Sequence, residues 1–147
     1  MLRVPLHLLA GDGPLPSYAR PGDAGADLTA GTDVVVPCRG GRMLVPTGVA
    51  VAIPPGYAGL VLPRSGLALR HGVTCLNSPG LIDSGYRGEI QVILVNHDSE
   101  HDYAVSAGDR IAQLVVIAVE EVAFELVAPD GLGEADRGTG GFGHSGI

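Results

Sequence analysis

The sequence predicts an all-β fold, a jelly-roll-like barrel with one short helix and a flexible Gly-rich C-terminal tail. Two observations predict it. The apolar 46% of the chain comes mostly from Val, Leu, Ile and Ala, with only 4% aromatic residues and no Trp. The Val-rich runs are interrupted by 23 Gly and 11 Pro, which favours many short strands over helices. A length of 147 residues fits one domain with a sizeable core.

Strands are expected at short intervals, separated by turns rich in Gly, Pro and Asn. They cover residues 4–9, 34–36, 48–53, 57–62, 73–76, 90–95, 103–105, 111–119 and 122–127. A single helix is predicted over residues 65–72, because Ser65 suits an N-cap, a cation occupies the last turn and Gly72 can end the helix. From residue 129 onward the apolar pattern stops. The predicted organisation is therefore a β-barrel domain, residues 1–128, and a tail, residues 129–147.

Charge and cysteine content exclude several classes of function. The net charge is −7 and the nine basic residues, all Arg, are scattered, so DNA and RNA are not expected partners. A small phosphorylated ligand remains possible, because a few Arg and a divalent metal suffice to neutralise it. Cys38 and Cys75 are too few for a disulfide framework, and each is expected to be a small buried residue in a reducing compartment.

No membrane segment or secretory signal is expected. The N-terminal apolar run is short and contains a proline, and residues 111–119 are about half as long as a membrane helix. A cytoplasmic protein is predicted.

The stretch 77–89 lies between the apolar runs 73–76 and 90–95, and is predicted to be the loop of a β-hairpin. A hairpin turn needs only about two to five residues, and this loop is far longer. It carries an amide (Asn77), a carboxylate (Asp83) and an aromatic ring (Tyr86) among glycines that let backbone approach a ligand. The residues alone leave two interpretations open, a ligand site or an irregular loop held by Asn, Asp and Ser turns.

Three other short motifs carry polar groups. Asp27 follows Ala24-Gly25-Ala26 just before an expected strand, where it is either a turn acceptor or a carboxylate facing a cation. In Pro63-Arg64-Ser65-Gly66, an Arg beside a hydroxyl at a helix start suits an anion, although a plain N-cap with an exposed Arg is the alternative. Gln113, alone in an apolar strand, needs a hydrogen-bond partner in the protein or in a ligand.

The tail is either disordered or a flap. Residues 138–143 satisfy G-x-G-x-x-G, yet no strand precedes them tightly and no helix follows, so a dinucleotide fingerprint is not supported. The protein has no Lys, which excludes a Walker A loop. A Gly-rich segment with Arg137 and Phe142 suits a lid over a ligand.

Together and in order, these five motifs resemble those of the trimeric deoxyuridine triphosphatases (dUTPases), over residues 24–146. The resemblance implies a jelly-roll-like barrel of the dUTPase type and a Mg²⁺-dependent hydrolysis of dUTP to dUMP and pyrophosphate. Such an enzyme supplies dUMP for dTMP synthesis and keeps uracil out of DNA. The resemblance also implies a homotrimer, in which the tail of one subunit closes a site formed by the other two.

The resemblance assigns roles at the base and sugar. Asp83 is the general base that activates water for in-line attack on the α-phosphorus. The Asn77 side chain and nearby backbone pair with uracil, and the Tyr86 ring packs under deoxyribose, leaving no room for a 2′-hydroxyl. Gln91 offers backbone contacts to the base, and Leu81 and Ile82 also belong to the substrate site.

The resemblance assigns the phosphate side to the other motifs. Arg64, Ser65 and Gly66 contact the phosphates, and Gln113 lies at the α-phosphate and the water. Asp27 holds, through water, a Mg²⁺ carried mainly by the substrate phosphates. In the tail, Arg137 meets the γ-phosphate, Phe142 stacks on uracil, and Gly143 and Ser145 complete the substrate contacts. His144 departs from the family pattern, and its role is open.

Two alternatives remain. A dCTP deaminase shares this fold but needs a proton shuttle at the base, commonly a Glu, where this hairpin has Asp83 and Tyr86. A catalytically silent nucleotide-sensing or partner-binding module would be expected to lack the base or an Arg, and this sequence lacks neither.

Overall fold

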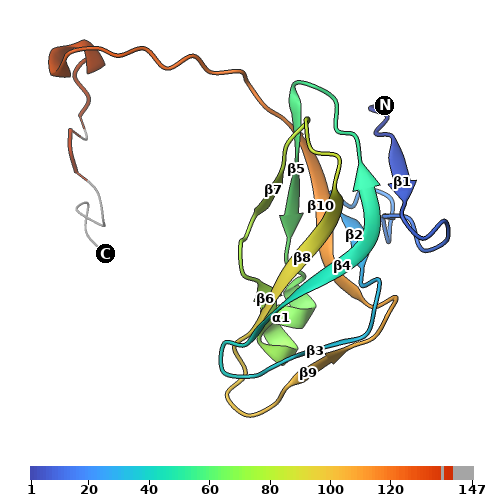
Figure 1. Cartoon of the computed structure of the whole chain (residues 1–147). Helices are drawn as coiled ribbons and strands as arrows, with labels where there is room; N and C mark the ends of the chain where they lie inside the picture. The colour runs from blue at the N-terminus through green and yellow to red at the C-terminus, as the bar shows by residue number, and fades with distance from the viewer. Residues whose placement is uncertain (137, 141–147) are drawn as a thin grey trace.

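The computed structural model describes residues 1–136 and 138–140, which form two four-stranded antiparallel sheets and a two-stranded ribbon (Figure 1). The first sheet has the order β1 (Leu6–Leu8), β4 (Arg42–Val51), β8 (Glu89–Asn96), β6 (Val73–Cys75). The second has the order β2 (Ala26–Thr29), β10 (Arg110–Ala118), β5 (Tyr57–Leu62), β7 (Gly80–Ile82). The ribbon pairs β3 (Val34–Val36) with β9 (Tyr103–Val105). The all-β, jelly-roll-like prediction is confirmed, although the described sheets do not close into a complete barrel.

The core lies between the two large sheets and follows from strand alternation. In β8, Ile90, Val92 and Leu94 are buried, whereas Gln91 between them is exposed on the outer face. In β10 of the other sheet, Ala112 and Leu114 are buried in the same cluster. Burying a large aliphatic side chain stabilises the fold by roughly 1.5–3 kcal/mol. The same alternation that builds the core therefore leaves polar side chains on the outer faces, where ligands can reach them.

Most strand predictions are confirmed. β3, β5 and β9 have the predicted bounds, and β8 and β10 differ by one residue at each end. β1 and β6 are shorter than expected, and β4 is longer, beginning at Arg42 where a strand over 48–53 was predicted. The β4 pairing shifts register between Pro46 and Ala50, and Gly48 there has a φ of 72°. The first half of β4 was not predicted from the sequence, because the strand contains Pro and Gly, and both normally interrupt strands.

The predicted strand over residues 122–127 is wrong. Near this end of the chain the Val119 N–H donates to the Gly56 carbonyl, at 2.9 Å. Beyond it an extended arm, residues 120–128, leaves the body of the molecule (Figure 1). Phe124 and Leu126 in this arm are 96% and 100% exposed. The apolar alternation is real, but within the described chain no strand lies beside it, and a strand requires a partner.

The predicted helix is α1 (Ser65–His71), followed by Gly72 with a φ of 63°. The Gly72 N–H donates to the Ala68 carbonyl, so this glycine ends the helix as expected. The N-cap prediction for Ser65 is wrong. The residue before the helix is Arg64 and makes no side-chain cap bond, so Ser65 is the first helical residue. A second short helix, the 3₁₀ turn η1 (Pro129–Leu132), follows the arm.

The two cysteines are both free but differ in burial. Cys75 lies in the core, as predicted, whereas Cys38 is half-exposed, and its expected burial is wrong. Cys38 follows the end of β3, and its backbone N–H donates to the Asp102 carboxylate at 2.8 Å. Among the described residues, no helix is long and apolar enough to cross a membrane.

Candidate active site

Strand pairing brings the first, second and fourth motifs together. β10 lies between β2 and β5, so Gln113 faces Asp27 in one neighbour and Leu62 in the other. Leu62 ends β5 and leads directly through Pro63 into Arg64. Residues from three distant parts of the chain thus meet at one point of the second sheet.

The Asp27 carboxylate is an ion-pair acceptor. Its Oδ1 lies 3.1 Å from Arg64 Nε and its Oδ2 lies 3.2 Å from Arg110 Nη1, and its side chain is only 14% exposed. Asp27 lies inside β2, so its predicted position before a strand is wrong, and the turn-acceptor interpretation fails with it. The alternative of a solvent-exposed Arg64 fails as well, because that side chain is largely covered and held by the pair.

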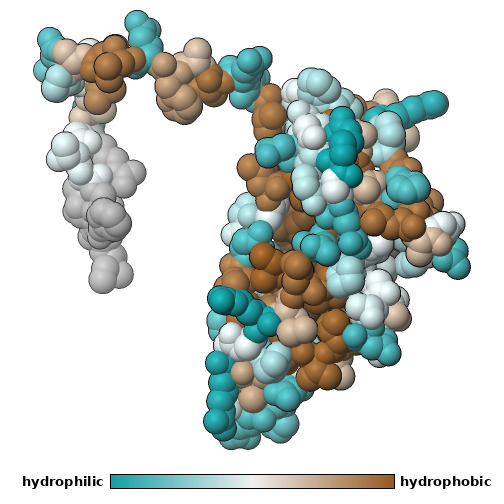
Figure 2. All heavy atoms as spheres, in the orientation of Figure 1, coloured by the Kyte–Doolittle hydropathy of each residue, from teal (hydrophilic) through white to brown (hydrophobic). Residues whose placement is uncertain are grey.

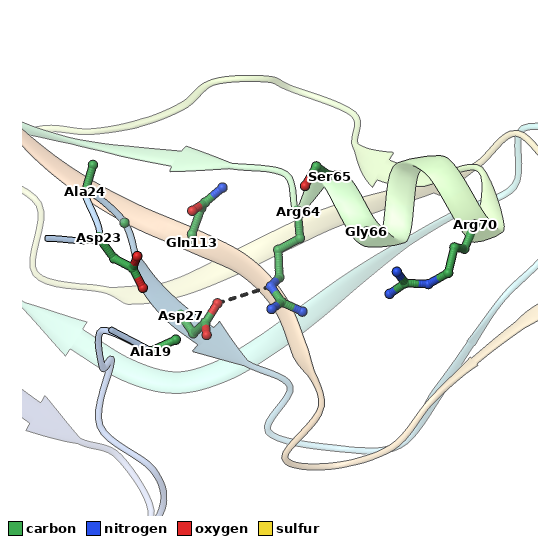
Figure 3. A pocket seen from close by; sticks show the side chains of 10 residues that line it. Ala19, Asp23, Ala24, Asp27, Arg64, Ser65, Gly66, Arg70 and Gln113 are labelled. Carbon is green, nitrogen blue, oxygen red and sulfur yellow. Dashed lines mark ion pairs between the residues drawn. The ribbon is translucent and has the colours of Figure 1, made fainter. Parts of the chain in front are cut away.

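These residues line a pocket of about 340 Å³, here called the phosphate pocket (Figure 3). Its walls are Asp27, Arg64, Ser65, Gly66 and Gln113, together with Ala19, Asp23, Ala24, Gly25 and Arg70. All five residues that the sequence placed on the phosphate side of the described chain are therefore in one cavity. Sequence reasoning missed Arg70, although its position one helical turn after Gly66 was a usable signal.

Gln113 has a structural partner and also faces the phosphate pocket. Its Nε2 donates to the Pro63 carbonyl at 2.9 Å, which fixes the orientation of the amide. A β-carbon at Gly25 would lie 2.5 Å from Gln113 Oε1, so the absence of a side chain at Gly25 makes room for that oxygen. The two interpretations of Gln113 are compatible, because the structural bond uses the amide nitrogen and leaves the oxygen at the pocket.

The hairpin prediction is confirmed, with one addition. β6 and β8 pair antiparallel, Val73 opposite Asn96 and Cys75 opposite Leu94. Between them the chain crosses to the other sheet, where β7 pairs with β5 through Leu81 opposite Leu60. The expected loop thus contains a strand, and the peptide bond of Ser78-Pro79 at the crossing is cis. The loop links the two sheets.

The loop forms a second cavity, of about 260 Å³, here called the hairpin pocket. It is lined by Leu81, Ile82, Asp83, Tyr86 and Gln91, with Leu44, Glu89 and Ile93. Asn77 opens onto an adjoining cavity of about 60 Å³, which shares Leu81, Ile82, Gln91 and Ile93 with the hairpin pocket. Every residue that the sequence placed at the base and sugar within the described chain therefore lies in one connected region.

Tyr86 is held in place by its own loop. Its hydroxyl donates to the Glu89 carbonyl at 2.8 Å, and its backbone N–H donates to the Asp83 carbonyl at 3.1 Å. A β-carbon at Gly88 would lie 2.5 Å from the Tyr86 hydroxyl oxygen, so a larger residue there would have to displace this ring. Asp83, just past β7, is exposed and free to meet a ligand.

The phosphate pocket and the hairpin region have no lining residue in common. The predicted tail residues Arg137, Phe142, Gly143 and Ser145, and His144 with them, lie outside the described residues. Within residues 1–136 and 138–140, no group of three or more His, Cys, Asp or Glu could hold a metal ion by itself.

The fold is an antiparallel β protein in which the motif residues line two separate pockets and an adjoining cavity. A model of the dUTPase family matches residues 12–146. The deoxyuridine 5′-triphosphate nucleotidohydrolase of Thermobifida fusca is 53% identical over 145 residues, 99% of this chain and 79% of that protein. The enzyme of the same name from Gloeobacter violaceus is 53% identical over 146 residues, covering 99% and 97%.

The fold agrees with these sequence matches. The dUTPase of Staphylococcus bacteriophage 80alpha, solved with dUPNHPP, superposes with a TM-score of 0.84 at 25% identity, over 100% of both chains. The chain belongs to the dUTPase family.

Proposed function

We propose that this chain hydrolyses dUTP to dUMP and pyrophosphate, with the triphosphate in the phosphate pocket and the nucleoside in the hairpin pocket. The observation that carries the proposal is the sorting of the motif residues. Within the described chain, those expected at phosphates line one cavity, and those expected at the base and sugar line the hairpin pocket and the cavity adjoining it. Relatives that are 53% identical over 99% of this chain are deoxyuridine 5′-triphosphate nucleotidohydrolases.

Asp83 is the proposed general base. Its carboxylate is exposed at the rim of the hairpin pocket, and it can take a proton from a water that attacks the α-phosphorus in line. A carboxylate is a weak base, but phosphoryl transfer depends mainly on positioning and on stabilising charge. Gln113 Oε1 can orient that water, since the Pro63 carbonyl holds the amide in one orientation.

Substrate selection is assigned to Asn77, Tyr86 and the backbone near Gln91. Asn77 pairs with the uracil edge, and the Tyr86 ring under the sugar leaves no room for a 2′-hydroxyl. The hydrogen bond from Tyr86 to the Glu89 carbonyl and the bare Gly88 beneath the ring support a fixed ring position. A ring held in one position is what exclusion of a hydroxyl requires.

The donor set of the phosphate pocket fits Mg²⁺ held chiefly by the substrate. Mg²⁺ usually keeps several waters and binds through one or two carboxylates plus phosphates. The pocket offers two carboxylates, Asp27 and Asp23, and Asp27 is already shared by two arginines. When bound, the metal would neutralise charge on the triphosphate, and Asp27 would hold it through water. Arg64, held by Asp27, stabilises the departing pyrophosphate, and Arg137 of the tail acts with it.

We also infer that the enzyme is a homotrimer with shared sites. In one copy the phosphate pocket and the hairpin pocket have no common lining residue, which supports a site completed by the surface of a second copy. The exposed apolar arm that carries the tail away from the body supports a contact with another subunit (Figure 2). The division into residues 1–128 and a closing tail, 129–147, is part of this proposal, as is a cytoplasmic location.

The first test is release of pyrophosphate from dUTP, dTTP, dCTP and UTP, each with Mg²⁺ and with EDTA. Metal-dependent release from dUTP alone supports the substrate, the metal and the sugar selectivity together. Absence of turnover on dUTP, with ammonia released from dCTP, would mean that the family's fold carries deaminase chemistry here. Glu89, the carboxylate a deaminase could use, already accepts the Gly48 N–H at 2.7 Å, so we expect no ammonia.

The assembly is tested by light scattering and by mixing. A mixture of an Asp83→Asn chain and an Arg64→Gln chain, refolded together, should recover part of the activity that each variant lacks, because shared sites combine one intact half from each. An active monomer, or mixtures as inactive as the separate variants, would refute shared sites.

A further inference from the structure

Arg70 lines the phosphate pocket but is not among the residues to which the resemblance assigned a role. Its guanidinium folds back over Gly66, so a β-carbon at Gly66 would lie 2.8 Å from Arg70 Nη2 and 3.3 Å from Cζ (Figure 3). Both residues line the pocket with Arg64 and Ser65. The bare backbone at Gly66 is what lets a second guanidinium reach this cavity.

Helix capping does not explain this position. A basic residue in the last turn of a helix commonly interacts with the free carbonyls at the helix end. The Arg70 side chain instead points toward the beginning of α1, as helical side chains tend to do. At the helix end, the Ala68 and Leu67 carbonyls accept the N–H of Gly72. Arg70 thus directs its charge at the pocket.

The charge of Arg70 is unmatched within the pocket. Arg64 is paired with Asp27, which is also shared with Arg110. The second carboxylate, Asp23, accepts the Arg20 backbone N–H at 2.8 Å. Over residues 1–136 and 138–140, no carboxylate comes within ion-pair distance of Arg70. In the described pocket, therefore, Arg70 is the cation available to a new anion.

The order of residues along the pocket indicates which phosphate Arg70 meets. Figure 3 shows Ala24 and Asp23 at one end, then Gln113, then Arg64 and Gly66, with Arg70 at the other end. If Gln113 lies at the α-phosphate, as the proposed function has it, the far end belongs to the β- and γ-phosphates. We propose that Arg70 binds the pyrophosphate half of dUTP, with its planar fork on two phosphate oxygens, and holds that half as it departs.

The inference rests on the proposed function and is tested by comparing ligands. Arg70→Gln removes the charge, Arg70→Lys keeps it without the fork, and Arg42→Gln is the control, since Arg42 is exposed on β4 outside the pocket. Calorimetry with the full chain and Mg²⁺ measures the Kd of α,β-imido-dUTP, pyrophosphate and dUMP. Circular dichroism checks that each variant is folded.

We expect Arg70→Gln to weaken binding of the imido analogue and of pyrophosphate roughly tenfold to a hundredfold, the range for a hydrogen bond to a charged group. Arg70→Lys should lose less, and dUMP, which lacks both outer phosphates, should bind all three variants as it binds the wild type. An unchanged Kd for pyrophosphate, or an equal loss for dUMP and the analogue, would overturn the inference.

The two proposals fail differently. If the wild type turns over dUTP but Arg70→Gln binds every ligand normally, only the role of Arg70 is refuted. If the wild type does not turn over dUTP yet binds pyrophosphate through Arg70, the proposed function is refuted and the phosphate-binding role is retained.

Discussion

Asp83 illustrates how a single exposed residue can carry chemistry without contributing to the core. It lies at the end of β7 on the rim of the hairpin pocket, and it makes no side-chain hydrogen bond or ion pair with the described protein. A reactive group at such a position costs the fold little. Replacing Asp83 should therefore affect catalysis and not stability.

We predict that Asp83→Asn lowers kcat by about 10²–10⁴-fold, the usual contribution of a general base, with little change in affinity for α,β-imido-dUTP. Asn keeps the size of the side chain but cannot accept the proton. Steady-state kinetics and calorimetry measure the two quantities. A variant with near-normal kcat would remove Asp83 from the mechanism.

Gly88 offers a test of the Tyr86 ring. A β-carbon there would lie 2.5 Å from the Tyr86 hydroxyl oxygen and 2.7 Å from Cζ, so Gly88→Ala must displace the ring. We expect a higher KM for dUTP and a smaller preference for dUTP over UTP. Gly85→Ala is the matched control, since nothing lies within 4 Å of a β-carbon at that position of the same loop. Equal effects of both substitutions would indicate general loop damage.

At the scale of the elements, the arm and tail differ from the sheets in how they are held. The buried core draws on the strands from β2 to β10 and on α1, whereas residues 120–136 are exposed. Removing residues from Arg137 onward should therefore abolish turnover and leave the sheets folded. Kinetics and far-ultraviolet circular dichroism measure the two effects. Loss of the β signal in the truncated chain would show that the tail stabilises the fold.

The elements also show where sequence reasoning succeeds. β5 and β9 were predicted with correct bounds because short Val- and Tyr-containing runs are bounded by turn residues. β2 and β7 were not predicted as strands, since their few residues lie among glycines and prolines. They become strands by pairing with β10 and β5, respectively. The prediction for residues 122–127 failed in the opposite way. A strand was expected from the apolar alternation, but no strand lies beside this segment in the described chain.

At the scale of the whole molecule, packing sets the acid–base behaviour of a core residue. Burial raises the pKa of the Cys75 thiol to about 11, from an ordinary value of 9.0. Above pH 9.0 the unfolded chain loses this proton before the folded chain does. The contribution to stability is therefore fully present below pH 9.0 and is lost as the pH rises toward 11.

We predict an alkaline loss of about 2–3 kcal/mol in the free energy of unfolding across this window, beyond the loss shown by Cys75→Val. Valine fills a similar volume and cannot ionise. Urea unfolding at pH 8, 10 and 11 measures the difference between the two proteins. Identical pH profiles would mean that the Cys75 thiol is not protected by the fold.

The five motifs, the all-β class and most strand positions could be read from the sequence, because they depend on local chemistry: alternation, turn residues and short polar patterns. The arrangement of the site could not. Asp27 meets Gln113 and Arg64 because β10 pairs with both β2 and β5. Pairings between distant segments are settled by the packing of the two sheets into one core, and a linear pattern contains no direct record of that packing.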